Sequence, residues 1–504
     1  MLRRAGPRLA AAALAGALLA AAQPHIGLWP ALFLAGPALY LLWEGRTPRA
    51  AFGVGWAAGA GFFAAALHWI VDPFFVDAAR HGWMAPFAIL LLAGGLALFW
   101  GAGFALAAAM GRVVGGPLAL ALAWTAAETA RGSVLTGFPW SLPAYAWMET
   151  PVAQGAALIG PYGLSLLTLA AVLAPGALLR RPRAFVPALV ALPALAALWL
   201  WGAARLEEAS APGPERPLIR VVQTDVDQRD KWEPENVVPQ FEALLALSTE
   251  GEAAPALVLW PEAAVSFPID MAEEARARIR GALGPAALGL GSLRLDAGPE
   301  ARIEIGARWR NSFFVLSGEG LSQPYDKIHL VPFGEYLPFD DFMSRIGVAA
   351  MAGLGGGIAP GRERRLMTAP GLPPFAALIC YEMIFPGETR AAAEGAEWLA
   401  LVTNDGWFGS WAGPAQHLAA ARLRAIETGL PVARAANRGY SAMIDPWGRT
   451  TPLRHGAAAV DARLPDSAAP TPYRRFGSGP ALFLGVVLVA VATLSRRRRD
   501  ISVN

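Results

Sequence analysis

The chain has 504 residues, of which 55% are hydrophobic and only 16% are charged, and its formal net charge at pH 7 is +3. Soluble globular domains carry about 25% charged residues, so this composition excludes an ordinary soluble protein. The positive excess comes from arginines at the ends of apolar segments and does not indicate a nucleic-acid-binding surface. A single cysteine excludes an internal disulfide.

Before residue 204 the sequence consists of apolar segments separated by short polar breaks. Each segment approaches the roughly 20 apolar residues that are needed to cross a bilayer core. The first segment also resembles a cleaved signal peptide, because arginines precede it and small residues end it, but we interpret it as a retained span. We predict seven spans in this part and an eighth near the C-terminus, at 8–24, 27–43, 50–70, 85–110, 116–130, 152–179, 184–203 and 478–495.

The arginines between the spans predict their orientation. If the N-terminus is cytoplasmic, the inside segments contain thirteen arginines, whereas the short outside loops contain only Arg80 and Arg131. Such an excess of basic residues is typical of cytoplasmic loops. The segment 204–476 is therefore predicted to lie outside the cytoplasm. Four polar residues at the outside ends of spans are expected to reach the membrane interface, with contact to lipid headgroups as the alternative, namely His68, Asp72, Glu128 and Arg131.

Between 204 and 476 acidic residues and prolines return, and the apolar runs shorten to the length of strands. Strand-like runs alternate with helical stretches over this segment, which predicts one layered α/β domain. We therefore divide the chain into a transmembrane part at 1–203, an extracytoplasmic α/β domain at 204–476, and a last span with a basic tail at 477–504. The predicted strands are 219–223, 256–260, 287–293, 312–317, 374–380, 398–403 and 441–445.

A carboxylate follows one of these strands directly. Residues 257–260 form an apolar run that ends at Pro261, and Glu262 comes next. In α/β sheets, ligands bind beyond the carboxyl ends of the strands, where a glutamate can act as a general base. The alternative is an acid that stabilises the N-terminus of a helix.

Lys327 stands out because the chain has only two lysines among its 42 basic residues. A lysine in such a composition indicates a need for a compact point charge that the planar guanidinium of arginine cannot supply. A developing oxyanion is one such need. The alternative is chance placement, which we consider the better interpretation of the other lysine, Lys231.

The only cysteine, Cys380, ends the apolar run 375–379 and is close in sequence to Glu382. This position favours a nucleophile over a small buried hydrophobic side chain, which is the usual state of a free cysteine. A cysteine with a carboxylate base and a cation fits nucleophilic catalysis without histidine. The six histidines show no metal-binding spacing, so we expect no metal and no cofactor.

Three motifs in this order, 260–262, 325–327 and 380–382, resemble the Glu-Lys-Cys triad of the nitrilase-type carbon–nitrogen hydrolase superfamily, whose fold is an α-β-β-α sandwich. The run 403–409 resembles its next motif. Seven spans before such a domain and one after it resemble the apolipoprotein N-acyltransferase family of the bacterial inner membrane. The runs 137–140, 222–223 and 231–232 also match that family, whereas Asp225 and Gly406 depart from its usual pattern in two loops.

The resemblance implies a two-step acyl transfer by a periplasmic catalytic domain. We expect the protein to act as a monomer. Glu262 takes the proton of Cys380, and the thiolate attacks an acyl ester of a membrane phospholipid. Lys327 and the backbone N–H of Tyr381 stabilise the oxyanion. The thioester then passes its acyl group to the α-amino group of the diacylglyceryl-modified N-terminal cysteine of an apolipoprotein, and Glu262 takes the proton of the amine.

Further residues have supporting roles in this interpretation. Glu335 is expected to hold Lys327 or to assist the base, and Glu382 to support the pocket, with a solvated surface acid as the alternative for each. Trp232, Tyr381 and Trp407 are candidate substrate contacts, with core packing as the alternative. The Gly-rich segment 342–361, including Met351 and Leu354, is a candidate lid that contacts acyl chains, with a surface loop as the alternative.

Two other functions were weighed. A membrane-anchored amidase or nitrilase for a small soluble amide would need only one anchoring span, so the seven N-terminal spans disfavour it. A transporter with an outside sensing domain would require polar residues near the bilayer midplane or broken spans in paired positions. The sequence shows neither feature.

Overall fold

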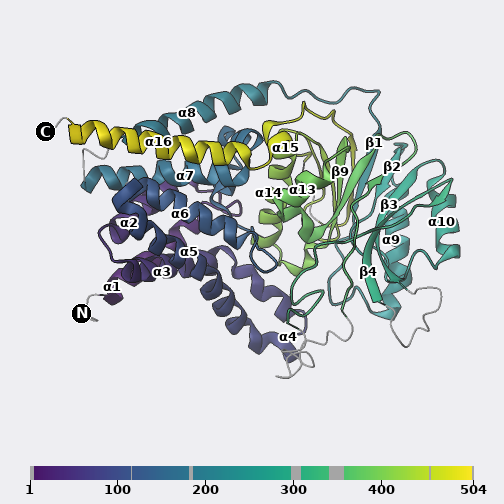
Figure 1. The fold of residues 1–504 in the computed structure, drawn as a ribbon. Helices are drawn as coiled ribbons and strands as arrows, with labels where there is room; N and C mark the ends of the chain where they lie inside the picture. The colour runs from purple at the N-terminus through teal and green to yellow at the C-terminus, as the bar shows by residue number, and fades with distance from the viewer. Residues whose placement is uncertain are drawn as a thin grey trace. The chain divides into compact units, whose positions relative to one another are not determined.

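The computed structural model describes residues 5–114, 116–180, 186–296, 308–339, 357–452 and 456–501. These residues form two compact units (Figure 1). Unit 1 groups Met1–Ser210 with Phe408–Gly429 and Pro470–Asn504, and unit 2 groups Ala211–Trp407 with Leu430–Ala469. The division into domains at 1–203, 204–476 and 477–504 stays a prediction, because spatial grouping does not measure which segments fold independently.

Unit 1 is helical. Within the described residues, three helices are long and apolar enough to cross a membrane, at Ala78–Met110, Pro151–Leu179 and Val190–Glu207. A bent pair of helices, Pro48–Ala66 with His68–Phe75, is a fourth if it counts as one span. The eight spans therefore stay a prediction. The long helices of this unit are α1 (Ala5–Ala20), α2 (Leu32–Trp43), α3 (Pro48–Ala66), α5 (Ala85–Val114), α6 (Gly116–Arg131), α7 (Ala156–Arg180), α8 (Val186–Glu207), α14 (Ala412–Thr428) and α16 (Gly479–Ile501).

Helix α14 is held in unit 1 by the side-chain amide of Gln416. The indole N–H groups of Trp69 and Trp140 donate to Gln416 Oε1 at 3.0 and 2.7 Å. The amide nitrogen donates to His25 Nδ1 and to the carbonyl of Ala66, both at 2.9 Å. Because Gln416 is buried, these four partners replace the hydrogen bonds that water would provide. A segment distant in sequence is thereby fixed to the N-terminal helices.

Glu128 and Arg131 are buried inside the protein, so the expectation that their side chains extend outward to the membrane interface is wrong. Both lie buried at the end of α6 and form an ion pair with each other. The indole N–H of Trp100 also donates to Glu128, and Arg131 also donates to the carbonyl of Phe138. These partners satisfy the two charges inside the protein, so neither has to extend to water.

We expect Glu128→Leu to lower the free energy of unfolding by about 3–5 kcal/mol, because Arg131 would stay buried without its carboxylate. Adding Arg131→Met should recover most of the loss. Thermal unfolding in detergent micelles measures both effects. Glu149→Leu is a matched control, because Glu149 is largely exposed, so the loss of its ion pair with Arg422 should cost less than about 1 kcal/mol. Equal melting of Glu128→Leu and wild type would contradict this account.

Unit 2 contains two β-sheets that pack on each other, since β1 contacts β10 and β4 contacts β8. The larger sheet has the order β12-β1-β2-β3-β4-β5, with β6 beside β4, and the smaller has the order β11-β10-β9-β8-β7. The predicted α/β sandwich is confirmed in these sheets. The strands are β1 (Leu218–Gln223), β2 (Leu257–Leu259), β3 (Ala287–Asp296), β4 (Arg308–Ser317), β5 (Gly320–Leu321), β6 (Tyr325–Asp326), β7 (Leu366–Met367), β8 (Phe375–Ile379), β9 (Trp398–Thr403), β10 (Val432–Ala436), β11 (Ala442–Ile444) and β12 (Ala458–Arg463).

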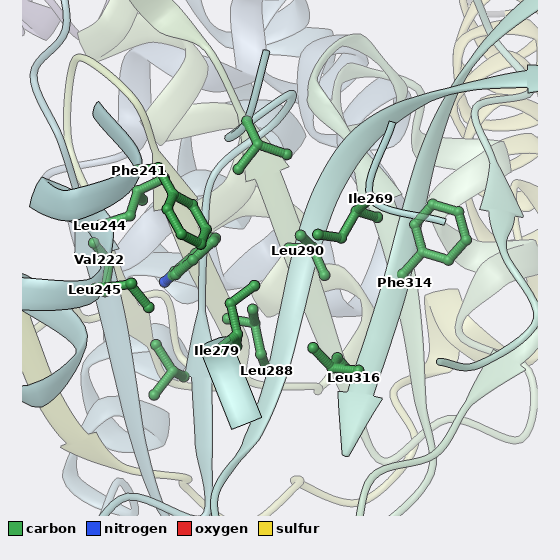
Figure 2. Close-up of a cluster of buried hydrophobic side chains, with 13 residues drawn as sticks. Val222, Phe241, Leu244, Leu245, Ile269, Ile279, Leu288, Leu290, Phe314 and Leu316 are labelled. Carbon is green, nitrogen blue, oxygen red and sulfur yellow. The ribbon is translucent and has the colours of Figure 1, made fainter. Parts of the chain in front are cut away.

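Two helices, α9 (Val237–Thr249) and α10 (Glu273–Leu283), cover one face of the larger sheet. Phe241 and Leu244 of α9 and Ile279 of α10 pack against Leu288 and Leu316 of the strands (Figure 2). The buried positions of α9 recur every three or four residues, which is the period of one helix face. This core fixes the larger sheet, so the residues that follow its strands are held in place.

Parallel pairing brings strand ends together within each sheet. β2 runs parallel to β1 and β3, and β9 runs parallel to β8 and β10. Glu262 follows β2 in the larger sheet, and Cys380 follows β8 in the smaller one. Both residues therefore lie just beyond carboxyl ends of parallel strands, where α/β sheets place their ligands.

Candidate active site

Cys380 lies at a sharp turn directly after β8. It begins the short 3-10 helix η8 (Cys380–Ile384), and its φ of 50° is in the left-handed region. This conformation costs a residue other than glycine roughly 1 kcal/mol or more, so the surrounding structure must enforce it. Burial and the negative charge of Glu262 raise the pKa of the thiol above its usual range, although Lys327 opposes this. This environment favours the neutral thiol, so attack by Cys380 would need a base.

Lys327 follows β6 and is buried between two carboxylates. Its Nζ lies 2.9 Å from Oε1 of Glu335 and 3.3 Å from Oε1 of Glu262. Burial alone would lower the pKa of this ammonium group, but the charges of Glu335, Glu262 and Cys380 raise it above its usual range. Lys327 is thus a fixed positive charge beside both the candidate base and the candidate nucleophile.

The turn that carries Glu262 packs closely on β3. The N–H of Gly291 donates to the carbonyl of Pro261 at 3.2 Å, and the N–H of Ala264 donates to the carbonyl of Gly291 at 2.9 Å. A Cβ atom at position 291 would lie 2.7 Å from Cα of Glu262. Glycine is therefore required here, because any side chain would push the candidate base away from the sheet.

Glu335 is also part of the site, so the alternative of a solvated surface acid is wrong. Besides Lys327, its carboxylate accepts hydrogen bonds from the N–H of Val331 at 2.8 Å and from Nδ2 of Asn311 at 3.2 Å. Asn311 Nδ2 donates to Glu262 Oε1 as well, at 2.7 Å. Sequence reasoning missed Asn311, which lies in the interior of β4 and belongs to no motif that we recognised.

Glu382 is fully buried, so the surface alternative is wrong for this residue too. Its Oε2 accepts from the N–H of Ile379, and its Oε1 accepts from the N–H of Ile328 and the hydroxyl of Tyr325, each at 2.8 Å. Burial raises the pKa of Glu382, while these hydrogen bonds act in the opposite direction. The side chain ties the segment around Lys327 to the strand end before Cys380.

Lys231 is buried beside the candidate base, so its interpretation as a chance lysine is wrong. Its Nζ donates to the carbonyl oxygen of Glu262 at 3.2 Å and lies 5.8 Å from the ring centre of Trp232. Burial lowers its pKa to about 8, although the charge of Glu262 acts in the opposite direction. Both lysines of the chain therefore contact Glu262.

The candidate substrate-binding aromatics differ from one another. Trp232 and Trp407 are 45% and 40% exposed, so core packing does not explain them. Tyr381 is buried and packs edge-on against the rings of His329 and Phe385. Met351 and Leu354, together with most of the candidate lid, lie outside the described residues. In the described part of the chain, no group of three or more His, Cys, Asp or Glu side chains could hold a metal ion.

Comparison with known proteins covers both parts of this chain. Residues 15–174 match the family of the apolipoprotein N-acyltransferase N-terminal domain, and residues 218–456 match the carbon-nitrogen hydrolase family. The chain is 39% identical to the apolipoprotein N-acyltransferase of Rhodopseudomonas palustris, over 97% of this chain and 95% of that protein. It is also 39% identical to that of Caulobacter vibrioides, over 98% and 95%. The chain belongs to the apolipoprotein N-acyltransferase family.

A solved amidase from Nesterenkonia AN1, of the nitrilase superfamily, is also similar to this family member. It shares 19% identity and a TM-score of 0.37, over 53% of this chain and 96% of the amidase.

The two departures from the pattern of N-acyltransferases lie in loops that Asn437 connects. The N–H of Asp225 donates to the carbonyl of Asn437 at 2.7 Å, and Nδ2 of Asn437 donates to Oδ1 of Asn404 at 3.1 Å. The N–H of Gly406 donates to that same oxygen at 3.2 Å. Asp225 also has a positive φ of 54° and pairs with Arg438. Neither residue contacts Glu262, Lys327 or Cys380 among the described interactions.

The buried amine of Lys231 predicts a pH dependence of stability. Its pKa is about 8 in the folded protein and about 10.4 in an unfolded chain, so the unfolded state binds more protons between these values. The free energy of unfolding should therefore rise with pH across this window, by up to about 3 kcal/mol. Lys231→Met should abolish this rise and should be more stable than wild type at pH 7.

Thermal unfolding of both proteins in detergent, from pH 7 to pH 10.5, measures the difference. Lys327→Met is the contrasting variant, because it leaves Glu262 and Glu335 buried without their cation and should lower stability at pH 7. If wild type and Lys231→Met melt in parallel across the pH range, the amine of Lys231 does not titrate as proposed.

Proposed function

We propose that this protein transfers a fatty acyl group from a membrane phospholipid to the α-amino group of the diacylglyceryl-modified N-terminal cysteine of apolipoproteins. Similarity to apolipoprotein N-acyltransferases along 97% of the chain carries this proposal. An amidase for a small amide would not account for residues 15–174, which match the N-terminal domain of the acyltransferase family. The protein is accordingly an acyltransferase.

In the first step, Glu262 takes the proton of Cys380, and the thiolate attacks the carbonyl carbon of a phospholipid ester. The oxyanion forms beside Lys327, whose charge is already in place, and beside the backbone N–H of Tyr381. Collapse of this intermediate breaks the ester C–O bond, and the leaving oxygen takes the proton from Glu262. Lysophospholipid leaves, and Cys380 carries the acyl group as a thioester.

In the second step, the α-amino group of the apolipoprotein attacks the thioester, and Glu262 takes a proton from the nitrogen. The same cation stabilises the second oxyanion. The C–S bond breaks, the amide is released, and the sulfur of Cys380 recovers its proton from Glu262. Oε1 of Glu262 lies 3.3 Å from Nζ of Lys327, so the base stays beside the cation that stabilises both oxyanions.

The remaining candidates position this machinery or contact lipid. Glu335 and Asn311 hold Lys327 and Glu262, and Glu382 fixes the turn at Cys380. We assign Trp232 and Trp407 to acyl-chain contacts, since large exposed aromatic surfaces suit apolar ligands. Met351 and Leu354 of the lid are assigned the same role from their apolar character within a Gly-rich segment.

The chemistry also favours one topology. Both substrates are lipid-anchored and the arginine distribution favours a cytoplasmic N-terminus, so we place the segment 204–476 on the periplasmic side of the bacterial inner membrane. Eight spans, with the first retained, are part of this proposal, as is action by a monomer. Water must be kept from the thioester, since hydrolysis would turn the enzyme into a lipase.

Mass spectrometry tests the thioester. Protein purified with phospholipid should carry one acyl group on the peptide that contains Cys380, and Cys380→Ala should carry none. The alanine variant removes one sulfur atom, so it should melt close to wild type while N-acylation of an apolipoprotein substrate is abolished. Normal N-acylation by Cys380→Ala would end the proposal of a thioester intermediate.

Lys327→Arg tests the point charge at the oxyanion. The planar, bulkier guanidinium cannot occupy the space between Glu262 and Glu335 in the same geometry, so single-turnover acylation should fall by about 100-fold or more. Asp461→Asn is a control, because it weakens an ion pair with Arg220 at the β1–β12 edge and should leave acylation near wild type. Wild-type acylation by Lys327→Arg would show that any positive charge suffices.

A further inference from the structure

Thr403, which ends β9, is placed beside Cys380 by the pairing of two strands. β8 and β9 are parallel, and Ile379 is paired with Val402. The next residue on each strand is Cys380 and Thr403, respectively, so the two residues are neighbours. The thiol and the Thr403 hydroxyl are hydrogen-bonded, and both side chains are buried. No step of the acyl transfer described above uses this hydroxyl.

A chain of buried polar groups continues from Thr403 away from the thiol. The Thr403 hydroxyl lies 3.0 Å from Oδ1 of Asp405, and Oδ2 of Asp405 lies 2.6 Å from Nη2 of Arg434. All three side chains are fully buried. Gly439, with a φ of 107°, packs against this carboxylate so closely that a Cβ atom would lie 2.6 Å from Oδ2. The carboxylate is therefore confined to one position.

The donor and the acceptor of each hydrogen bond among Cys380, Thr403, Asp405 and Arg434 follow from the chemistry of the groups. Arg434 is always protonated, and its pairing keeps Asp405 ionised. An ionised carboxylate only accepts hydrogen bonds, so Thr403 must donate its proton to Asp405. A hydroxyl has a single proton, which leaves only a lone pair for Cys380. A hydroxyl that donated to the sulfur would lower the pKa of Cys380. The single proton of Thr403 is directed at Asp405, so the thiol donates the hydrogen bond between Cys380 and Thr403.

We propose that the Thr403–Asp405–Arg434 chain holds Cys380 as a protonated thiol in the resting enzyme, by fixing the Thr403 hydroxyl as a hydrogen-bond acceptor. Thr403 is then a positioning residue that opposes premature ionisation of the nucleophile. The charged groups that face the thiol are Glu262, Lys327 and Asp405. Glu262 can remove the proton only by breaking the thiol–Thr403 bond. The proposal goes beyond the acyl transfer and does not depend on the identity of either substrate.

Alkylation by iodoacetamide without lipid substrates tests the proposal, because Cys380 is the only thiol of the chain. Thr403→Val keeps the shape of the side chain but removes the acceptor. The neutral thiol would lose one hydrogen bond, so alkylation at pH 7 should become about two- to tenfold faster, and the midpoint of its pH profile should move down. Thr403→Ser is the matched control, which keeps the hydroxyl and should retain the wild-type pH profile.

Asp405→Asn tests whether the Thr403 hydroxyl donates its hydrogen bond to residue 405. The amide can donate to Thr403, which frees the hydroxyl proton to point at the sulfur and should accelerate alkylation at least as much as Thr403→Val does. In the double variant that combines Asp405→Asn with Thr403→Val, the asparagine should add no further acceleration of alkylation, because there is no longer a hydroxyl whose proton could turn toward the sulfur. Thermal unfolding identifies any variant that fails to fold, and the threonine variants remain decisive if Asp405→Asn does.

Slower or unchanged alkylation of Thr403→Val would overturn the proposal, since it would show that the hydroxyl donates to the thiolate or does not act on it. An equal gain from Asp405→Asn with and without Thr403 would also overturn it, because the charge of Asp405 would then act through space. Neither result bears on acyl transfer. Failure here and failure of the proposed function are thus distinguishable.

Discussion

The site depends on one buried positive charge. Removing the Lys327 ammonium from water is costly unless its charge is balanced, and Glu262 and Glu335 provide that balance at 3.3 and 2.9 Å. Asn311 contacts both carboxylates and sets the distance between them. Without the ammonium, the carboxylates of Glu262 and Glu335 would repel each other. The position of the candidate base therefore depends on the position of Lys327.

The two sheets supply different parts of this arrangement. Glu262 and Asn311 come from the larger sheet, whereas Cys380 and Thr403 come from the ends of adjacent strands in the smaller one. Alignment of the reacting groups is therefore a property of how the sheets pack. Glu382 stabilises that packing directly, because one buried carboxylate binds the backbone on both sides.

Local sequence identifies residues whose position along the chain determines their role. Glu262 and Cys380 each follow an apolar strand, and Lys327 is rare in composition, so all three could be selected as candidates, and the structure brings them together. Lys231 and Asn311 could not, because their role comes from neighbours far away in the sequence. Strand β10 was also missed, since its run of Val, Ala and Arg alternates little in polarity. Glu128 and Arg131 were placed at the interface because sequence does not reveal that charges have partners inside.

The location of both lysines gives the protein an unusual chemical signature. Apart from six histidines, arginine supplies every other basic side chain, so the amines open to acylating reagents are the N-terminus and the two lysines that contact Glu262. These lysines differ in nucleophilicity, because Lys231 releases its proton near pH 8 whereas Lys327 holds its proton. Among the buried amines, an acylating or carbamylating probe would therefore react with Lys231. The rate of that reaction would measure how often the site opens to solvent.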